Sequence, residues 1–396
     1  MNIKELIRYA KKRAVRFAVL PLRIFPTSKS RVLLINDMSP SFSDNLKYIG
    51  LELRKRDESI TIYYCGHTLN CFDQLKELNI TPVIINSIKY FYYGMTSKVI
   101  VTNSGGISYL PLKKDQYVIN TWHGGGAYKK MGVDMYESSP LFRKDLLLAA
   151  RETSIYLSTC ERFKNAFCKS MLASPAKFWE IGMPRNDMLI NGDSQKRSRI
   201  RQRLGLKSEE KLVLFAPTYR KPKDNYFNDS IAISYDIDCS RVCNALQKRF
   251  GGKWIFGFRF HPCVTNRTGL PEGNVIDLTD YEDMQELLLV ADVMINDFSS
   301  SMWDFMLTKK PCFIFAKDLQ HYIETTSLYT PVEEWPFPIA TSNEALETNI
   351  INFSFEKYHN DCKKHYSDLG GSESGHATRL VCDRILELCK GKQGTE

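Results

Sequence analysis

The stretch RVLLINDMSPSFSDNLKYIGLELRKRDESITIYYC, residues 31–65, predicts the class of fold. Residues 31–36 form a short apolar run that is typical of a buried strand. Residues 45–56 have the character of a helix, and residues 59–65 alternate and contain β-branched side chains. A strand, a helix and a second strand in this order indicate a parallel sheet covered by helices.

The same rhythm continues along the chain and then restarts near residue 188. Because 396 residues exceed the usual size of one hydrophobic core, two domains are expected. We predict two doubly wound, Rossmann-like α/β domains that face a cleft, which is where such folds bind ligands. The N-terminal domain spans 30–188, and the C-terminal domain, with a closing helix, spans 189–396. Further strands are expected over 82–86, 98–102, 116–121, 212–216, 254–260, 275–277, 293–296 and 312–316, and further helices over 72–78, 194–204, 239–250, 283–291 and 299–307.

Residues 1–29 differ from the rest and are predicted as a separate basic amphipathic segment. Apolar residues recur at helical spacing from Leu6 to Ala18, and Lys and Arg fill most of the other positions. The apolar run is too short and too charged to span a bilayer, which needs roughly 20 apolar residues. A helix of this kind suits an anionic membrane surface. The alternative is an ordinary solvated helix packed on the body of the protein.

Bulk composition narrows the choice of partners. The net charge of +9 favours anionic ligands or an anionic membrane. We expect no nucleic-acid partner, because zinc-finger spacing, basic-zipper heptads and RNA-binding aromatic motifs are missing from the sequence. The 11 cysteines are odd in number and contain no CxxC pair, which indicates reduced thiols. Cys239 and Cys243 lack further ligands nearby, so no metal site is predicted.

One candidate catalytic motif lies in the first domain, in the run NTWHGGGAYKK at residues 120–130. His123 follows a predicted strand directly, at the edge of the sheet where catalytic groups gather. A histidine can accept a hydroxyl proton near neutral pH. The glycines after it let a backbone approach a ligand closely. The alternative is a histidine satisfied by a backbone carbonyl in a tight turn.

Three further motifs end strands of the second domain. FAPTYR at 215–220 supplies Arg220, and FRFHP at 258–262 supplies Arg259 and His261. Guanidinium groups can hold a phosphate in a bidentate grip. INDFSSSMWDF at 295–305 places serines where a helix begins, and amides at such a position bind anions. The alternatives are a solvated loop and a capped helix without ligand. Four motifs at strand carboxyl ends together favour a ligand site.

Taken in order, these motifs resemble the CDP-glycerol glycerophosphotransferases of teichoic-acid and capsule synthesis. The resemblance runs from about residue 45 to the final helix. It rests on DNLKYI at 44–49, TWHG at 121–124, GMPRND at 182–187, APTYR at 216–220, RFHP at 259–262, NDFSS at 296–300, and FAKDL at 315–319 with Tyr322.

The resemblance implies a glycosyltransferase-B-like fold, a CDP-glycerol donor, release of CMP and a lipid-linked polymer as acceptor. It also implies a peripheral position on the cytoplasmic face of the cell membrane. By the same resemblance the catalytic residues are His123 and His261. The donor-binding residues are Thr218, Arg220, Arg259, Asp297, Ser299 and Ser300. An acceptor or phosphate loop would contain Gly124, Gly125, Gly126 and Lys129. The family often has Thr-Pro-Leu-Lys after Trp-His-Gly, whereas this chain has Gly-Gly-Ala-Tyr at 125–128. This departure from the family pattern concerns the acceptor more than the donor.

Several alternatives stay open at this point. A CDP-ribitol donor fits the same motifs, and so does a nucleotide-sugar glycosyltransferase of the same fold. A non-catalytic, membrane-bound nucleotide sensor is a more distant alternative, and a basic nucleic-acid-binding protein is the most distant. The sequence indicates no required cofactor and is compatible with bound Mg²⁺.

Overall fold

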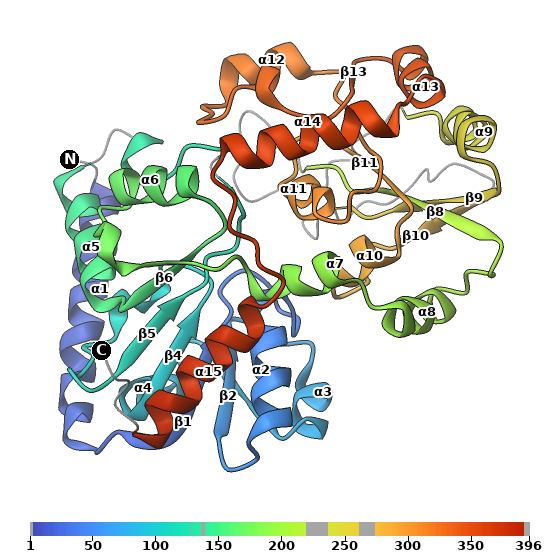
Figure 1. Cartoon of the computed structure of the whole chain (residues 1–396). Coiled ribbons are helices and arrows are strands. Elements are labelled where there is room, and N and C mark those ends of the chain that lie inside the picture. Colours follow the sequence, from blue (N-terminus) through green and yellow to red (C-terminus); the bar gives the residue numbers. More distant parts are fainter. Residues whose placement is uncertain (1–2, 127, 136–138, 219–236, 261–273, 392–396) are drawn as a thin grey trace. The chain divides into compact units, whose positions relative to one another are not determined.

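The computed structural model describes residues 3–126, 128–135, 139–218, 237–260 and 274–391 (Figure 1). The chain divides into two compact units, each an α/β domain around its own parallel sheet. Unit 1 contains residues 1–187 and 369–396, and unit 2 contains residues 188–368. The predicted class, two parallel α/β domains in tandem, is confirmed, and the predicted boundary at 188 lies one residue from the observed one.

Unit 1 contains a seven-stranded sheet in the order β3-β2-β1-β4-β5-β6-β7, with every neighbouring pair parallel. The strand order reverses direction between β1 and β4, and ligands of such sheets bind outside the carboxyl ends at that reversal. The strands are β1 (Ser28–Ile35), β2 (Thr61–Gly66), β3 (Ile80–Ile84), β4 (Ser97–Thr102), β5 (Tyr117–Asn120), β6 (Ile155–Ser158) and β7 (Phe178–Glu180).

The helices of unit 1 cover both faces of this sheet. They are α1 (Ile3–Val19), α2 (Asp44–Arg56), α3 (Phe72–Glu77), α4 (Ile88–Thr96), α5 (Pro140–Glu152), α6 (Glu161–Ser170) and α15 (Ala377–Lys390). The five strands expected in this part of the chain are confirmed, with ends that shift by a few residues. Strands β6 and β7 and helices α4 to α6 were not predicted from the sequence.

Alternation along β1 builds the two cores of unit 1. Val32 and Leu34 belong to the core beneath α2 and α15, whereas Leu33 and Ile35 belong to the core on the α4 face. All four side chains are at most 1% exposed. Successive side chains of a strand point to opposite faces, so one apolar run supplies both cores.

The closing helix α15 belongs to unit 1, which corrects the prediction that it completes the C-terminal domain. Its buried stripe packs against the sheet and α2 of unit 1, because an apolar helical face must be covered and the partner lies there. The carboxylate of Asp187 accepts hydrogen bonds from the first amides of this helix, Ala377 N at 3.0 Å and Thr378 N at 2.7 Å. The stripe consists of Ala377, Val381, Cys382, Ile385, Leu386 and Cys389.

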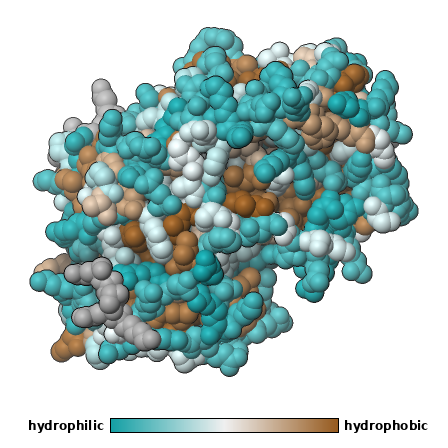
Figure 2. Space-filling view, viewed as in Figure 1, coloured by the Kyte–Doolittle hydropathy of each residue, from teal (hydrophilic) through white to brown (hydrophobic). Residues whose placement is uncertain are grey.

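Helix α1 forms as predicted, but its polar side faces the body of unit 1. Lys12 Nζ lies 3.0 Å from Asp145 Oδ2, and Arg16 pairs with Glu152. Val15 and Val19 of this helix pack on the core of the α4 face, whereas other apolar residues face outward, with Ile7 62% and Phe17 78% exposed. Figure 2 shows apolar residues scattered between the polar residues that dominate the visible surface. None of the helices in the described part of the chain is long and apolar enough to cross a bilayer.

Unit 2 contains a six-stranded parallel sheet in the order β10-β9-β8-β11-β12-β13, which reverses between β8 and β11. The strands expected in this part of the sequence are confirmed, and β13 adds one that was not expected. The strands are β8 (Glu210–Phe215), β9 (Lys253–Phe258), β10 (Val275–Asp277), β11 (Val293–Asn296), β12 (Cys312–Phe315) and β13 (Ile339–Ala340). The helices are α8 (Ser194–Arg203), α9 (Cys239–Phe250), α10 (Met284–Val290), α11 (Ser301–Met306), α12 (Leu319–Thr325), α13 (Asn343–Ile351) and α14 (Phe355–Asp368).

Candidate active site

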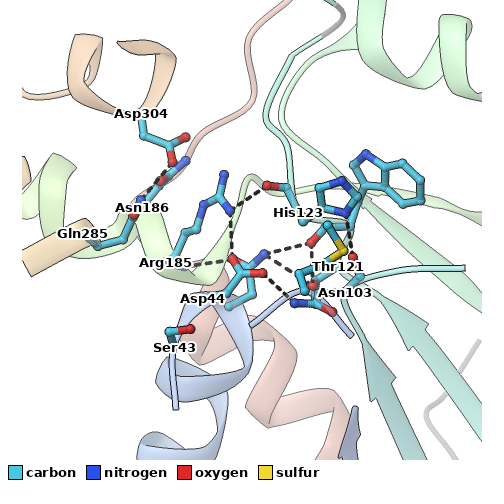
Figure 3. A network of polar contacts seen from close by, with 12 residues as sticks. Ser43, Asp44, Asn103, Thr121, His123, Arg185, Asn186, Gln285 and Asp304 are labelled. Atoms are coloured by element: carbon cyan, nitrogen blue, oxygen red, sulfur yellow. Dashed lines mark hydrogen bonds and ion pairs between the residues drawn. The ribbon is translucent and has the colours of Figure 1, made fainter. Parts of the chain in front are cut away.

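His123 lies three residues after β5, at the carboxyl edge of the unit 1 sheet, as the sequence predicted. The chain leaves the strand through Trp122, whose φ of 55° is left-handed. The side chain of Asn120 fixes this turn by accepting a hydrogen bond from the Trp122 amide at 2.8 Å. The turn places the imidazole beside the loop that follows β4 (Figure 3).

The imidazole of His123 makes one hydrogen bond that determines its tautomer. Its Nδ1 atom lies 2.9 Å from the main-chain oxygen of Asn103. A carbonyl oxygen can only accept, so Nδ1 carries the proton and Nε2 of the neutral ring is an acceptor. The alternative for His123 was a ring satisfied by a backbone carbonyl. That hydrogen bond exists, but it uses only one of the two ring nitrogens. The other nitrogen has the protonation state of a general base.

Burial lowers the pKa of His123 below its ordinary value. The hydrogen bond to Asn103 and the negative charge of Asp44 raise this pKa, and the positive charge of Arg185 lowers it. Because the lowering by burial is the largest of these effects, the imidazole is neutral at pH 7. A neutral imidazole is the form that can take a proton from an acceptor hydroxyl.

Two charged residues that the sequence analysis did not assign to the site, Asp44 and Arg185, support His123. Arg185 Nη1 donates to Asp44 Oδ1 and to the main-chain oxygen of His123, both at 2.8 Å. Asn103 Nδ2 donates to Asp44 Oδ2 at 2.8 Å. These contacts and the bond from His123 Nδ1 close a ring of four residues (Figure 3). Asp44 lies in the DNLKYI motif and Arg185 in the GMPRND motif. Both motifs supported the family resemblance, but the sequence alone assigned no chemical role to either residue.

The predicted glycine loop contains positions with different requirements. Gly126 has a φ of 77°, and a Cβ atom there would lie 2.1 Å from the ring of Tyr128, so this position requires glycine. Its amide donates to Thr159 Oγ1 at 2.9 Å. Gly124 borders open space, since a Cβ atom there would meet no atom within 4 Å. Gly125 is half-buried, and Lys129 is exposed.

In unit 2, Thr218 and Asp297 meet at the point where the strand order reverses. Thr218 follows β8, Asp297 follows β11, and the Thr218 amide donates to Asp297 Oδ1 at 2.8 Å. Asp297 is buried and also accepts from the amide of Phe298. The carboxylate therefore shapes both loops at the edge where ligands of such sheets bind.

The two serines of the same motif lie at the start of α11. Ser299 is half-buried and its main-chain oxygen accepts from Asn296 Nδ2 at 2.9 Å. Ser300 is exposed at the N-cap position, but its side chain makes no capping hydrogen bond. The expected position is confirmed for Ser300, and its hydroxyl is not used by the helix.

Arg259 follows β9 directly, and its guanidinium turns into unit 2. Nη2 donates to the main-chain oxygen of Tyr281 at 3.0 Å, and Nη1 lies 3.1 Å from Met284 Sδ. Burial lowers the pKa of Arg259, and Asp283 opposes that effect. The other two predicted residues, Arg220 and His261, lie outside the described residues. Among the residues that are described, no group of three or more His, Cys, Asp or Glu side chains could hold a metal ion.

Comparison with known proteins agrees with this architecture. Residues 18–387 match the model of the family described as CDP-glycerol:poly(glycerophosphate) glycerophosphotransferase. The chain is 28% identical over 367 residues to a teichoic acid poly(glycerol phosphate) polymerase of Staphylococcus epidermidis, covering 87% of this chain and 49% of that protein. It is 27% identical to a teichoic acid glycerol-phosphate transferase of Staphylococcus aureus, covering 87% of this chain and 90% of the relative.

A solved structure of the wall teichoic acid polymerase TagF has the same fold. It matches with a TM-score of 0.82 and 23% identity over 98% of each chain. The lengths of the curated relatives differ, and the chain spans about half of the Staphylococcus epidermidis polymerase.

Proposed function

The chain belongs to the CDP-glycerol:poly(glycerophosphate) glycerophosphotransferase family, and on that premise we propose that it is a glycerophosphotransferase. It moves glycerol phosphate from CDP-glycerol to a hydroxyl group of a lipid-linked cell-surface polymer, of the teichoic-acid or capsular type, and releases CMP. The observation that carries the proposal is the state of His123, whose Nδ1 is bonded to Asn103 and whose Nε2 is available for a proton.

The reaction is an attack of the acceptor oxygen on the phosphorus that bears glycerol. The oxygen–phosphorus bond forms, the proton of the hydroxyl moves to His123 Nε2, and the bond between this phosphorus and the CMP oxygen breaks. CMP leaves with the bonding electrons. Positive groups near the pyrophosphate stabilise the leaving charge, a role that the proposal gives to His261, Arg259 and Arg220.

The residues assigned to the donor belong to unit 2. Thr218 and Asp297 form the reversal point of that sheet, and their mutual hydrogen bond supports this role. The exposed Ser300 offers a hydroxyl that the helix does not use, and Ser299 lies beside it. On the acceptor side, the open space beside Gly124 supports close approach of a ligand to the Gly124, Gly125 and Gly126 backbone, with Lys129 exposed near it.

A cofactor is not part of the proposed step. The side chains named above carry the stabilisation of charge, and a Mg²⁺ ion on the pyrophosphate is compatible with the same reaction. Activity measured with EDTA and then with added Mg²⁺ decides between these two versions. A loss of activity that Mg²⁺ restores would assign part of the stabilisation to the metal.

The proposed acceptor requires a membrane surface, and α1 supports a peripheral position on the cytoplasmic face. Its outward side displays Ile7 and Phe17, and the adjacent 3-10 helix, Leu20–Ile24, adds Ile24, which is 84% exposed. Arg8 and Lys11 are exposed near this apolar side and suit anionic headgroups. Lys12 and Arg16 are used for contacts with the body instead.

A CDP-ribitol donor is the second candidate, because relatives of both kinds match the chain. One is a teichoic acid poly(ribitol-phosphate) polymerase of Bacillus spizizenii, 24% identical over 97% of this chain and 61% of its own length. The deciding experiment incubates the protein with a lipid-linked acceptor and CDP-glycerol, CDP-ribitol or a UDP-sugar. Preferential CMP release from CDP-glycerol supports the proposal, and release from CDP-ribitol alone supports the second candidate. Turnover of the UDP-sugar alone indicates a glycosyltransferase, and no turnover with any donor favours a non-catalytic nucleotide sensor.

A further inference from the structure

The ring around His123 is formed by residues that come from distant parts of the chain. Asp44 begins α2, Asn103 follows β4, and Arg185 lies in the 3-10 helix Pro184–Asn186. Within unit 1, 141 positions separate Asp44 from Arg185 in the sequence. Arg185 holds the main-chain oxygen of His123, while Asn103 holds its ring. The histidine is therefore fixed at both its backbone and its side chain (Figure 3).

A second set of bonds ties the same segments together. Asn45 Nδ2 donates to the main-chain oxygen of Trp122 at 3.2 Å, and Asn45 Oδ1 accepts from the Arg185 amide at 3.1 Å. Asn45 thus connects the histidine loop to Arg185, while Asp44 connects Asn103 to Arg185. Two adjacent side chains that both bind Arg185 restrict this region more than a single contact would.

The energetic features of the ring point to a role beyond stability. The side chains of Arg185 and Asp44 are only 9% and 14% exposed. Burying an ion pair removes both groups from water, and a well-packed apolar pair is often at least as stable. Two residues of this region are also left-handed, Asp44 with a φ of 60° and Trp122 with a φ of 55°. Such conformations are unfavourable in residues with a Cβ atom and gather at functional sites.

We infer that Asp44 and Arg185 are positioning residues for His123, which keep its Nδ1 on the main-chain oxygen of Asn103 and its Nε2 directed at the acceptor hydroxyl. The inference rests on the proposed function for the identity of that acceptor. Asp44 holds the side-chain amide of Asn103, and the main-chain oxygen of Asn103 selects the tautomer of His123. Arg185 holds the main-chain oxygen of His123. Neither residue touches the reacting atoms, so both act through His123.

Their opposite charges give the inference a distinctive signature. The ionisable groups that shift the pKa of His123 are Asp44, at the start of α2, and Arg185, in the 3-10 helix Pro184–Asn186, whereas Asn103, which follows β4, is uncharged. Asp44→Asn removes a negative charge and should lower the pKa of His123. Arg185→Met removes a positive charge and should raise it. Loosening of the fold alone would not move the two variants in opposite directions.

The test measures kcat and KM for CDP-glycerol-dependent CMP release by the full chain between pH 5 and 8. Both variants should lose up to roughly 100-fold in kcat with little change in the KM for the donor, because a small displacement of a catalytic group has effects of that size. The acid limb of the profile should move to lower pH in Asp44→Asn and to higher pH in Arg185→Met. Arg185→Lys restores the charge and should return the limb toward its original position.

A matched control lies on the same helix. Arg56 ends α2 and pairs with Asp383 of α15. Arg56→Met removes an ion pair of unit 1 at the opposite end of α2 from Asp44, about 18 Å away at 1.5 Å per residue. This variant should keep the kcat and the pH profile of the original protein.

A measurement that does not depend on turnover separates this inference from the proposed function. The titration of the His123 imidazole is followed by NMR and assigned by its absence in His123→Asn. If the protein releases no CMP from any donor but the two variants shift this titration in opposite directions, the proposed function fails and the ring stands. Shifts in the same direction, or kcat unchanged in both variants, would overturn the inference. If Arg185→Met does not fold, the titration and the kcat of Asp44→Asn, which keeps the shape of the side chain, test the inference.

Discussion

The indole ring of Trp122 stacks on the imidazole of His123, with ring centroids 4.6 Å apart and planes inclined by 28°. The indole also meets the ring of Phe167 in α6 in an edge contact, with ring centroids 5.0 Å apart. The left-handed backbone of Trp122 thus presents a large apolar surface to the histidine. This stacking contributes to the burial that lowers the pKa of His123.

Trp122→Ala should raise the pKa of His123 toward its ordinary value of 6.5, because it removes part of that burial. In the original protein kcat/KM should rise with pH along an acid limb centred below 6.5 and then reach a plateau, since the base must be neutral. In the variant the limb should move to higher pH. Trp122→Phe keeps a stacking ring and should leave the limb close to its original position. A limb centred above pH 7 in the original protein would contradict the assignment of His123.

His123→Ala should nearly abolish transfer and leave the affinity for CDP-glycerol mostly intact. Loss of a general base reduces the rate typically by ~10²–10⁴-fold. The affinity should persist because the residues assigned to the donor lie in unit 2. CMP release measures the first effect and calorimetric titration the second. A variant that retains more than half of the activity would rule out this base.

Arg259→Ala and Arg220→Ala should weaken donor binding. A charge-assisted hydrogen bond contributes about 1.5–3 kcal/mol, so the Kd for CDP-glycerol should rise roughly tenfold or more. Calorimetric titration is the direct measurement. Lys253→Met, which removes the Lys253–Glu210 pair at the start of β9, is a control that should leave the Kd unchanged. Unchanged Kd values in both arginine variants would refute their placement at the donor.

The double variant Ile7→Glu and Phe17→Glu should reduce co-sedimentation with anionic liposomes. Both side chains lie on the outward side of α1, where carboxylates oppose insertion into an anionic leaflet. Activity with a soluble acceptor analogue should survive, whereas activity with a lipid-linked acceptor should fall.

The control for α1 makes the same change at exposed apolar positions of unit 2. Ile351 and Phe355 are 40% and 44% exposed, and Ile351→Glu with Phe355→Glu should bind liposomes like the original protein. Removal of residues 1–26 should also release the protein from membranes. Equal sedimentation of all these forms would mean that α1 is a structural helix only.

Asp187→Ala should destabilise the closing helix α15. Its carboxylate accepts from two of the first amides of the helix, and loss of such a cap reduces helix stability by about 1 kcal/mol. Hydrogen exchange of the α15 amides is the suitable measurement, because a chain with two units need not unfold in one step. Asp187→Asn retains an acceptor oxygen and should show a smaller effect. Equal protection of α15 in Asp187→Ala and the original protein would contradict this capping role.

The sequence by itself determined the fold class, the point near residue 188 where the second sheet begins, and the position of His123 after a strand. Apolar runs such as residues 31–36 are local signals, and the end of a predicted strand locates the edge of a parallel sheet without knowledge of the neighbours. The segment from residue 131 to 181 lacked comparably clear motifs, and there the strands β6 and β7 were not predicted.

Only the tertiary structure decided which unit owns α15 and which residues surround His123. The apolar stripe of α15 shows that the helix needs a partner, but not which sheet supplies one. Likewise, Asp44 and Arg185 are 141 positions apart, and no periodicity relates two charges across such a distance. Their pairing depends on β5, α2 and the Pro184–Asn186 turn meeting at one edge of the sheet. Local patterns specify strands and helices, whereas contacts between distant residues arise only when those elements pack together.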